Sequence, residues 1–331
     1  MRLLLLCLMI LLAPQRAQAD TCAASMTDVV FGTVSPVAAT DVYANGTLSV
    51  TCNWTLLSNL NVLLLPNVSI CVNASVGSGG TAISARALAS GSATLPFNLY
   101  RDSAYVPSSI WGTTASSGTV PLSTTMGGLL AIGSLTRAFT VYAKIPAAGL
   151  AGVPTVGGAD TLYSSSFAGA ASIQYAFYGA LAPAPACTVG QSSSFSFTAQ
   201  ATVTNNCFIN TTTLAFGANN RVLTSAVRAQ STLSVQCTAG NPYSISLNGG
   251  SVAGNPAARK MRNALTGETI AYELSNGLDG VLWGDGALGT ATLTGTGNGA
   301  QQVLQVYGRV LAQKTPSPGE YRDTVTATVY F

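Results

Sequence analysis

The sequence predicts an all-β protein of two tandem domains. Polar and apolar residues alternate in runs such as 47–51 (TLSVT), 244–247 (SISL) and 324–329 (TVTATV), which is the period of half-buried β-strands. Turn-forming pairs such as Asn45-Gly46 and Pro318-Gly319 separate these runs at the spacing of a β-sandwich. The same order of elements also occurs twice along the chain, so we expect two copies of one sandwich domain.

The repeat matches elements of the two halves in the same order. Residues 47–52 (TLSVTC) correspond to 232–237 (TLSVQC), and Trp111 corresponds to Trp283. A repeat of this length indicates duplicated domains rather than short solenoid units. Because Trp111 recurs, we expect it in a core rather than on a binding surface. Two further pairs are 30–32 with 215–217 and 141–144 with 306–309.

Residues 1–19 have the features of an export signal. Arg2 precedes an apolar run from Leu3 to Leu12, and residues 17–19 (AQA) fit the small-x-small pattern that a signal peptidase cleaves. The run is too short to span a bilayer, and no later run approaches the roughly 20 apolar residues that a transmembrane helix needs. We therefore expect an exported mature chain that starts near Asp20.

Six cysteines remain once Cys7 leaves with the signal, an even number that favours three disulfides in an oxidising compartment. A metal site is the alternative, but no two cysteines have C-x-x-C spacing and the chain has 0 His. We expect neither a metal nor a cofactor. The six are Cys22, Cys52, Cys71, Cys187, Cys207 and Cys237.

Charge and composition argue against an enzyme and against nucleic-acid binding. Charged residues make up 8% of the chain and nearly balance, which offers no basic surface to a phosphate backbone. Without histidine, a serine or cysteine nucleophile lacks its usual base. Asp279 and Asp285 lie in a Gly-rich turn, where carboxylates commonly cap backbone groups.

The C-terminal half resembles the spore coat protein U family, which supplies the pilins of archaic chaperone-usher pili. The matching segments are 233–237 (LSVQC), 259–261 (RKM), 282–286 (LWGDG), 306–309 (VYGR) and 318–325 (PGEYRDTV). The N-terminal half matches more loosely. The resemblance implies two immunoglobulin-like, pilin-type β-sandwiches, with the last strand of an incomplete sandwich supplied by a periplasmic pilus chaperone and later by an adjacent pilin subunit.

A segment between the domains predicts how the first sandwich is completed. Residues 195–203 alternate, with Phe195, Phe197, Ala199, Ala201 and Val203 on one face. We expect this strand to complete domain 20–194 in cis, whereas domain 195–331 lacks its last strand and must receive one. The alternative is that 195–203 is an ordinary first strand of the second domain.

The position of this donor strand predicts a terminal subunit. Ahead of Cys22 we expect only Asp20 and Thr21 in the mature chain, too few residues for a strand given to another subunit. The resemblance then implies a tip adhesin that passes through the periplasm and an outer-membrane usher to the cell surface. A structural subunit of a spore coat or pilus shaft remains the alternative.

Added loops in the first domain predict where it binds. The insertion after Cys52 is strongly apolar, and apolar residues at a sandwich end either build extra core or expose a binding patch. We expect the loops 53–67, 101–135 and 179–194 at the end distal to the second domain. The candidate contact residues are Leu56, Leu57, Leu60, Leu63, Tyr105, Val106, Ile110, Leu129, Leu130 and Leu181.

These aliphatic loops favour attachment to hydrophobic or host surfaces, and hence biofilm formation. A carbohydrate-binding, lectin-like tip is the alternative, although sugars are usually held by aromatic faces and dense hydrogen bonding. The apolar loop 147–154 should face the second domain, and it joins the contact surface if the strand count is wrong by one.

The equivalence of the two domains also predicts the disulfide pairing. Cys22–Cys52 and Cys207–Cys237 would each join the start of a domain to the end of its second strand. Cys71 then pairs with Cys187.

Overall fold

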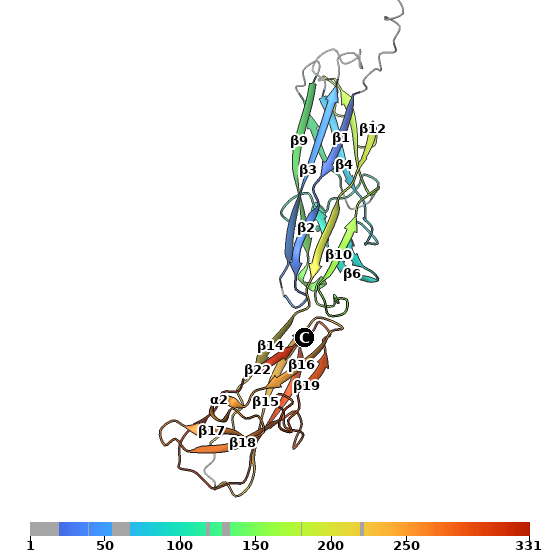
Figure 1. The fold of residues 1–331 in the computed structure, drawn as a ribbon. Coiled ribbons are helices and arrows are strands. Elements are labelled where there is room, and N and C mark those ends of the chain that lie inside the picture. The colour runs from blue at the N-terminus through green and yellow to red at the C-terminus, as the bar shows by residue number, and fades with distance from the viewer. Residues whose placement is uncertain are drawn as a thin grey trace, which may run out of the picture.

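The computed structural model describes residues 20–38, 40–54, 67–116, 120–127, 133–179, 181–218 and 222–331. The expected signal segment, residues 1–19, lies outside them. The described residues form two elongated β-structures, one beyond the other, with the C-terminus beside the joint between them (Figure 1). No helix among the described residues is long and apolar enough to cross a bilayer.

The first domain contains three sheets. One has the order β1 (Thr21–Met26), β3 (Val42–Trp54), β9 (Gly133–Ile145), β7 (Asn98–Tyr100). The next has the order β2 (Val29–Val34), β13 (Thr198–Val203), β10 (Thr161–Ser166), β5 (Ala87–Ser90), β6 (Ala93–Pro96). The third has the order β12 (Gln191–Phe195), β11 (Ala171–Tyr178), β4 (Asn67–Ala74), β8 (Leu122–Met126). Two 3₁₀ turns, η1 (Pro107–Ser109) and η2 (Ala147–Gly149), lie in its loops.

The second domain contains two sheets. The six-stranded sheet has the order β14 (Cys207–Thr211), β15 (Val227–Cys237), β20 (Gln302–Val310), β18 (Thr269–Ser275), β17 (Arg259–Asn263), β21 (Tyr321–Arg322). The three-stranded sheet has the order β19 (Leu293–Thr296), β16 (Pro242–Leu247), β22 (Ala327–Tyr330). A single helical turn, α2 (Gly250–Ala253), follows β16. The strand predicted over 324–329 is shorter than expected, because only 327–330 pair.

Strand alternation gives each domain its own core. Leu48 and Val50 of β3 are fully buried, as are Ile245 of β16 and Val235 of β15. The first core contains residues from Cys22 to Val203, and the second contains residues from Cys207 onward. The all-β class and the two-domain arrangement predicted from the sequence are confirmed.

The recurring tryptophans are core residues, as predicted. Trp111 and Trp283 are 0% and 1% exposed. Each indole nitrogen donates a hydrogen bond to a strand carbonyl, Trp111 to Val72 at 2.8 Å and Trp283 to Ile245 at 2.9 Å. A buried indole needs such a partner, so these bonds fix both rings in the same place in the two domains.

All three disulfides have the predicted pairing. Cys22–Cys52 and Cys207–Cys237 each join residues that lie opposite one another on paired strands. The third, Cys71–Cys187, ties the segment before β12 to β4 across 116 residues of sequence. The Ser69 hydroxyl also donates to the carbonyl of Pro185 at 3.1 Å, so this segment is held beside β4 at two points.

The loop that follows β9 packs against the second domain. Pro154 forms a parallel bridge with Ala239, and the Asn241 side-chain amide donates to Thr155 Oγ1 at 2.6 Å. Leu150 and Val153 are buried. The loop 147–154 therefore faces the second domain, as the strand count predicted, and does not join a distal surface.

Candidate functional sites

Residues 195–203 lie within the sheets of the first domain. β13 lies between β2 and β10, parallel to the first and antiparallel to the second. The predicted apolar face is buried throughout, since Phe195, Phe197, Ala199, Ala201 and Val203 are all at most 8% exposed. The pairing begins earlier than predicted, because β12 extends the strand back to Gln191 beside β11.

Phe197 anchors this strand in the core. Its ring stacks on Phe167, with centroids 4.3 Å apart, and lies parallel to Trp111 at 6.2 Å. Its carbonyl accepts a hydrogen bond from the Phe167 amide at 3.0 Å. The first core therefore contains, at its centre, the strand that comes last in the sequence of the first domain.

The second domain has no counterpart of β13 among its described residues. β22 forms the outer edge of its sheet, and β21 pairs with β17 alone. Phe216, the counterpart of Phe31, lies outside any strand and is only half-buried, whereas Phe31 is buried in β2. Val325, Ala327 and Val329 pack on the core yet stay partly exposed. The second sandwich thus leaves an unpaired strand edge beside incompletely covered core residues.

The predicted contact residues lie in different environments. Leu56, Leu57, Leu60, Leu63, Leu129 and Leu130 lie outside the described residues. Leu181 is fully exposed in the segment tied to β4, and Val106 is 43% exposed. Ile110 is buried at 8% exposure, and its backbone pairs with that of Tyr100 at the end of β7. The prediction that Ile110 is a contact residue is wrong.

The placement of Tyr105 at the distal end is also wrong. The distal ends of β3 and β9 are Trp54 and Gly133, which lie opposite one another. The Tyr105 ring instead packs on Tyr43, with centroids 4.7 Å apart, and Tyr43 is the second residue of β3. The start of β3 is the end that lies toward the second domain (Figure 1). The loop folds back along the sheet after β7, so its first part lies on the side of the domain.

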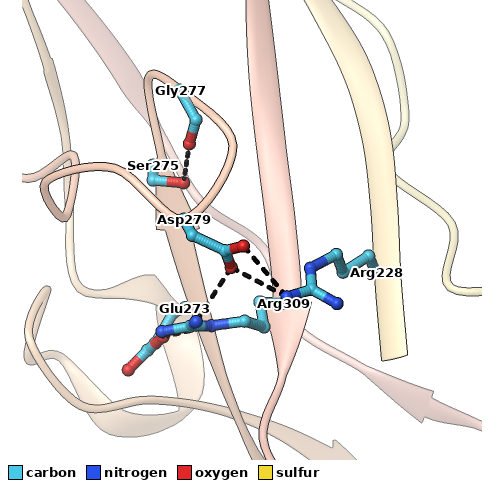
Figure 2. A network of polar contacts seen from close by, with 6 residues as sticks. All are labelled: Arg228, Glu273, Ser275, Gly277, Asp279 and Arg309. Carbon is cyan, nitrogen blue, oxygen red and sulfur yellow. Dashed lines mark hydrogen bonds and ion pairs between the residues drawn. The ribbon is translucent and has the colours of Figure 1, made fainter. Parts of the chain in front are cut away.

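A network of charged side chains joins β15, β18 and β20 of the second domain to the loop after β18 (Figure 2). Arg228 donates to both oxygens of Asp279, at 2.9 and 3.1 Å. Arg309 donates to Asp279 at 2.9 Å and to Glu273 at 2.8 and 3.0 Å. These residues line a hollow of 340 Å³.

The charges in this network cancel. Two guanidinium groups face two carboxylates, and the hydrogen bond from Arg228 holds the pKa of Asp279 below its ordinary value. Asp279 has a φ of 54°, which is unusual for a residue other than glycine. The network therefore fastens the loop after β18 to the sheet and leaves no unpaired charge among these four residues for a ligand. Among the described residues, no three His, Cys, Asp or Glu side chains gather into a metal-binding group.

Sequence analysis missed two buried arginines, Arg86 and Arg259. They are 1% and 0% exposed, and each donates to several backbone carbonyls, among them that of the core tryptophan of its domain. Each arginine lies 12 residues after a strand residue whose carbonyl it binds, Ala74 for Arg86 and Leu247 for Arg259, so both stand at the same point of the repeat. That recurrence is the signal that could have identified them.

Three solved structures of pilus proteins are similar to this chain only at low identity and with TM-scores under 0.5. The chaperone–tip adhesion subunit complex CsuC–CsuE of archaic Csu pili of Acinetobacter baumannii is 16% identical, with a TM-score of 0.49 over 94% of this chain and 100% of that one. A chaperone–tip adhesin complex of CFA/I fimbriae is 11% identical, with a TM-score of 0.31 over 95% and 98% of the two chains. The Hda pilus minor tip subunit HdaB of E. coli is 15% identical, with a TM-score of 0.25 over 37% of this chain and 79% of that one.

Sequence comparison is more decisive. Among curated protein sequences, none matches this chain. The profile of the Spore Coat Protein U domain, however, matches residues 10–162 and again residues 193–328. Each half of the chain contains one of the two matches, which together cover most of the chain, and the protein therefore belongs to the Spore Coat Protein U domain family.

Proposed function

We propose that this protein is the tip subunit of a chaperone-usher pilus, where it attaches the cell to surfaces and promotes biofilm formation. The observation that carries the proposal is that one strand, β13, is present in the first domain and has no counterpart among the described residues of the second. β13 fills the place between β2 and β10 in the first domain, and the equivalent place beside β21 and β22 has no strand among the described residues. The chain uses β13, its donor-like strand, to complete its own first domain. Its second domain offers the free edge of β22 to a strand from another protein.

The unpaired edge of β22 determines which kind of partner the second domain needs. An apolar strand with alternating side chains would pair with β22 and cover Phe216, Val325 and Val329. A periplasmic pilus chaperone would supply that strand first, and an adjacent pilin subunit would supply it after passage through the outer-membrane usher. The final position is the cell surface.

Attachment is assigned to the distal end of the first domain. Fully exposed Leu181 follows β11, whose last residue Tyr178 pairs with Asn67 at the start of β4. The apolar insertion 53–66 begins with the last two residues of β3, at the same end. Burial of aliphatic side chains against a surface gains about 25 cal/mol per Å² of apolar area removed from water. Each pilus then binds weakly, and many pili act together.

The strand-acceptor role separates this proposal from a shaft or coat subunit. A shaft subunit must also give a strand to its neighbour, whereas 195–203, the segment that has the alternating apolar face, pairs within its own domain. Aliphatic contact residues also favour a hydrophobic surface over a lectin-like tip.

The test adds a copy of residues 195–203 after Phe331 through a flexible linker. If the second domain is a strand acceptor, the added strand should stabilise it without a chaperone and prevent its incorporation into pili. The control carries Asp at the positions that copy Ala199 and Ala201, so that it cannot enter an apolar core. Equal stability of the control and the unmodified copy, or normal incorporation of the stabilised chain, would contradict the proposal.

A further inference from the structure

The same loop in each domain is fastened to the sheet by a residue in the left-handed conformation. Tyr105 in the first domain has a φ of 53°, and Asp279 in the second has a φ of 54°. Matching bridges frame both loops, Tyr100 with Ile110 and Ser275 with Leu282. The two loops therefore occupy equivalent places on equivalent sheets.

The strand register shows which side chains correspond beneath these loops. Val42 pairs with Ile145 in the first domain, and Val227 pairs with Val310 in the second. At equivalent positions of this register the first domain has Tyr43, Tyr142 and Lys144. The second domain has Arg228, Tyr307 and Arg309 there, in the same order. The second domain fastens its loop with the ion network of Figure 2 and has one tyrosine, Tyr307, at this place. The fold therefore does not require the aromatic rings of Tyr43 and Tyr105, whose places are taken by Arg228 and Asp279.

Four tyrosines gather there in the first domain. The Tyr105 ring lies 4.7 Å from Tyr43, 5.3 Å from Tyr100 and 6.2 Å from Tyr142, measured between centroids. Tyr43 is 52% exposed, and the other three are half-buried. We call these four residues the tyrosine cluster. It presents aromatic surface to solvent on the side of the first domain.

Polar groups border the tyrosine cluster. Asp41 and Lys144 form an ion pair at 2.6 Å, and the Lys144 ammonium lies 5.8 Å from the centroid of the Tyr43 ring. The Tyr43 hydroxyl donates to Asp41 at 3.3 Å. The border thus combines a carboxylate acceptor, an ammonium donor and phenol hydroxyls, while its formal charges cancel.

We propose that the tyrosine cluster, together with Asp41 and Lys144, binds a neutral saccharide. Sugar rings have apolar C–H faces that pack on aromatic rings, and their hydroxyls both donate and accept hydrogen bonds. A purely aliphatic ligand would displace water from this polar border and supply no hydrogen bonds in its place, at a cost in desolvation. A nucleic acid or an acidic glycan would need excess positive charge, which Asp41 neutralises.

This site is separate from the distal end and does not depend on the position of the protein in a pilus. It lies beside the end of β3 near the second domain, whereas the proposed contact with hydrophobic surfaces lies at the opposite end. Saccharide binding on the side of the domain and attachment through its tip can therefore be lost independently.

The experiment measures binding of the full chain to methyl glycosides and disaccharides of glucose, galactose, mannose and N-acetylglucosamine, by calorimetry and saturation-transfer NMR. Two variants remove rings with little strain. Tyr43→Ser changes the most exposed ring, and Tyr105→Gly suits a backbone at positive φ. The matched control is Tyr307→Ser, since Tyr307 occupies the register position of Tyr142 in the second domain.

We expect at least one of these sugars to bind and each cluster variant to weaken its binding by about tenfold or more. The control should bind like the unmodified chain. The proposal is overturned if no sugar of the panel binds at millimolar concentration, or if Tyr43→Ser binds as well as the unmodified chain. Equal losses in Tyr307→Ser and the cluster variants would also overturn it.

Discussion

The two buried arginines show how single residues organise each sandwich. Arg86 donates to the carbonyls of Ala74, Ser75 and Trp111 and to the side chain of Asn98, at 2.6 to 2.8 Å. None of these acceptors is a carboxylate. Burial lowers the pKa of Arg86, yet four charge-assisted hydrogen bonds favour its protonated form. The guanidinium therefore acts as a fixed donor that joins strand ends around the core tryptophan.

Replacement of Arg86 by Met should strongly destabilise the first domain. Methionine fills part of the volume but leaves the carbonyls of Ala74 and Trp111 buried without donors, so we expect a loss of about 3 kcal/mol in the free energy of unfolding. Urea denaturation followed by tryptophan fluorescence measures it. The control Arg101→Met changes a half-exposed arginine. A stability equal to that of the unmodified chain would show that Arg86 does not hold these carbonyls.

The ion network around Asp279 should make the second domain sensitive to acid. The hydrogen bond and charge of Arg228, with the charge of Arg309, lower the folded pKa of Asp279 below its ordinary value of 3.8. The stability that ionised Asp279 gives to the folded domain is therefore fully present above pH 3.8 and is lost as the pH falls through the lowered pKa. The difference in melting temperature between the unmodified chain and Asp279→Asn should be present at neutral pH and shrink in strong acid.

Thermal unfolding between pH 7 and pH 2 checks this expectation, with Asp160→Asn as a control at an exposed acid of the first domain. A difference for Asp279→Asn that stays constant over this range would show that the network does not depend on ionised Asp279.

At the scale of elements, alternation and repetition in the sequence predicted the strands, both core tryptophans, the disulfide pairing and the buried face of 195–203. These features depend on short-range periodicity or on matching of the two halves, which a sequence displays directly. The misplaced Tyr105 and Ile110 belong to one loop whose path depends on a left-handed residue. Side-chain alternation carries no information about such a turn.

The tyrosine cluster was hidden from sequence analysis for a related reason. Tyr43, Tyr100, Tyr105 and Tyr142 come from three strands and a loop, and only the register of β3, β7 and β9 brings them together. Register is set by long-range pairing and turn geometry. Sequence reasoning could therefore locate strands but not the surface that they form side by side.

The apolar insertion between β3 and β4 should decide attachment to hydrophobic surfaces. Replacement of Leu56, Leu57 and Leu60 by Ser should reduce attachment to polystyrene because it removes apolar area from the proposed contact. High salt should leave attachment unchanged, since few charges take part. Pilus length should also stay the same, because assembly uses the second domain.

A matched control replaces three exposed leucines of the second domain, Leu265, Leu278 and Leu288, by Ser. Its attachment should equal that of the unmodified chain. If the first triple variant is not secreted, the insertion belongs to the core. If both triple variants lose attachment equally, the contact is not specific to the distal end.

At the scale of the whole molecule, the joint determines how force passes from the first domain to the second. Only residues 204–206 connect β13 to β14, but side chains on both sides reinforce this connection. Buried Asn241 donates to Thr155 and to Asn205, and Asn206 donates to Ser35 at 3.0 Å. Buried hydrogen bonds between the domains favour one orientation of the first domain relative to the second. That orientation would keep the distal end of the first domain in line with the long axis of the second.

Gly299 is the residue at which this packing can be tested most directly. A Cβ atom at Gly299 would collide with the carbonyl oxygen of Ala151 in the loop after β9, whereas a Cβ at Gly289 would meet no atom. Both glycines have nearly equal φ angles, 79° and 78°, so alanine strains the two backbones alike. Gly299→Ala should therefore open the joint, and Gly289→Ala should not. Small-angle scattering of the two variants distinguishes them. A wider distribution of interatomic distances in Gly299→Ala alone indicates a packed joint, and identical curves would mean that the domains do not touch there in solution.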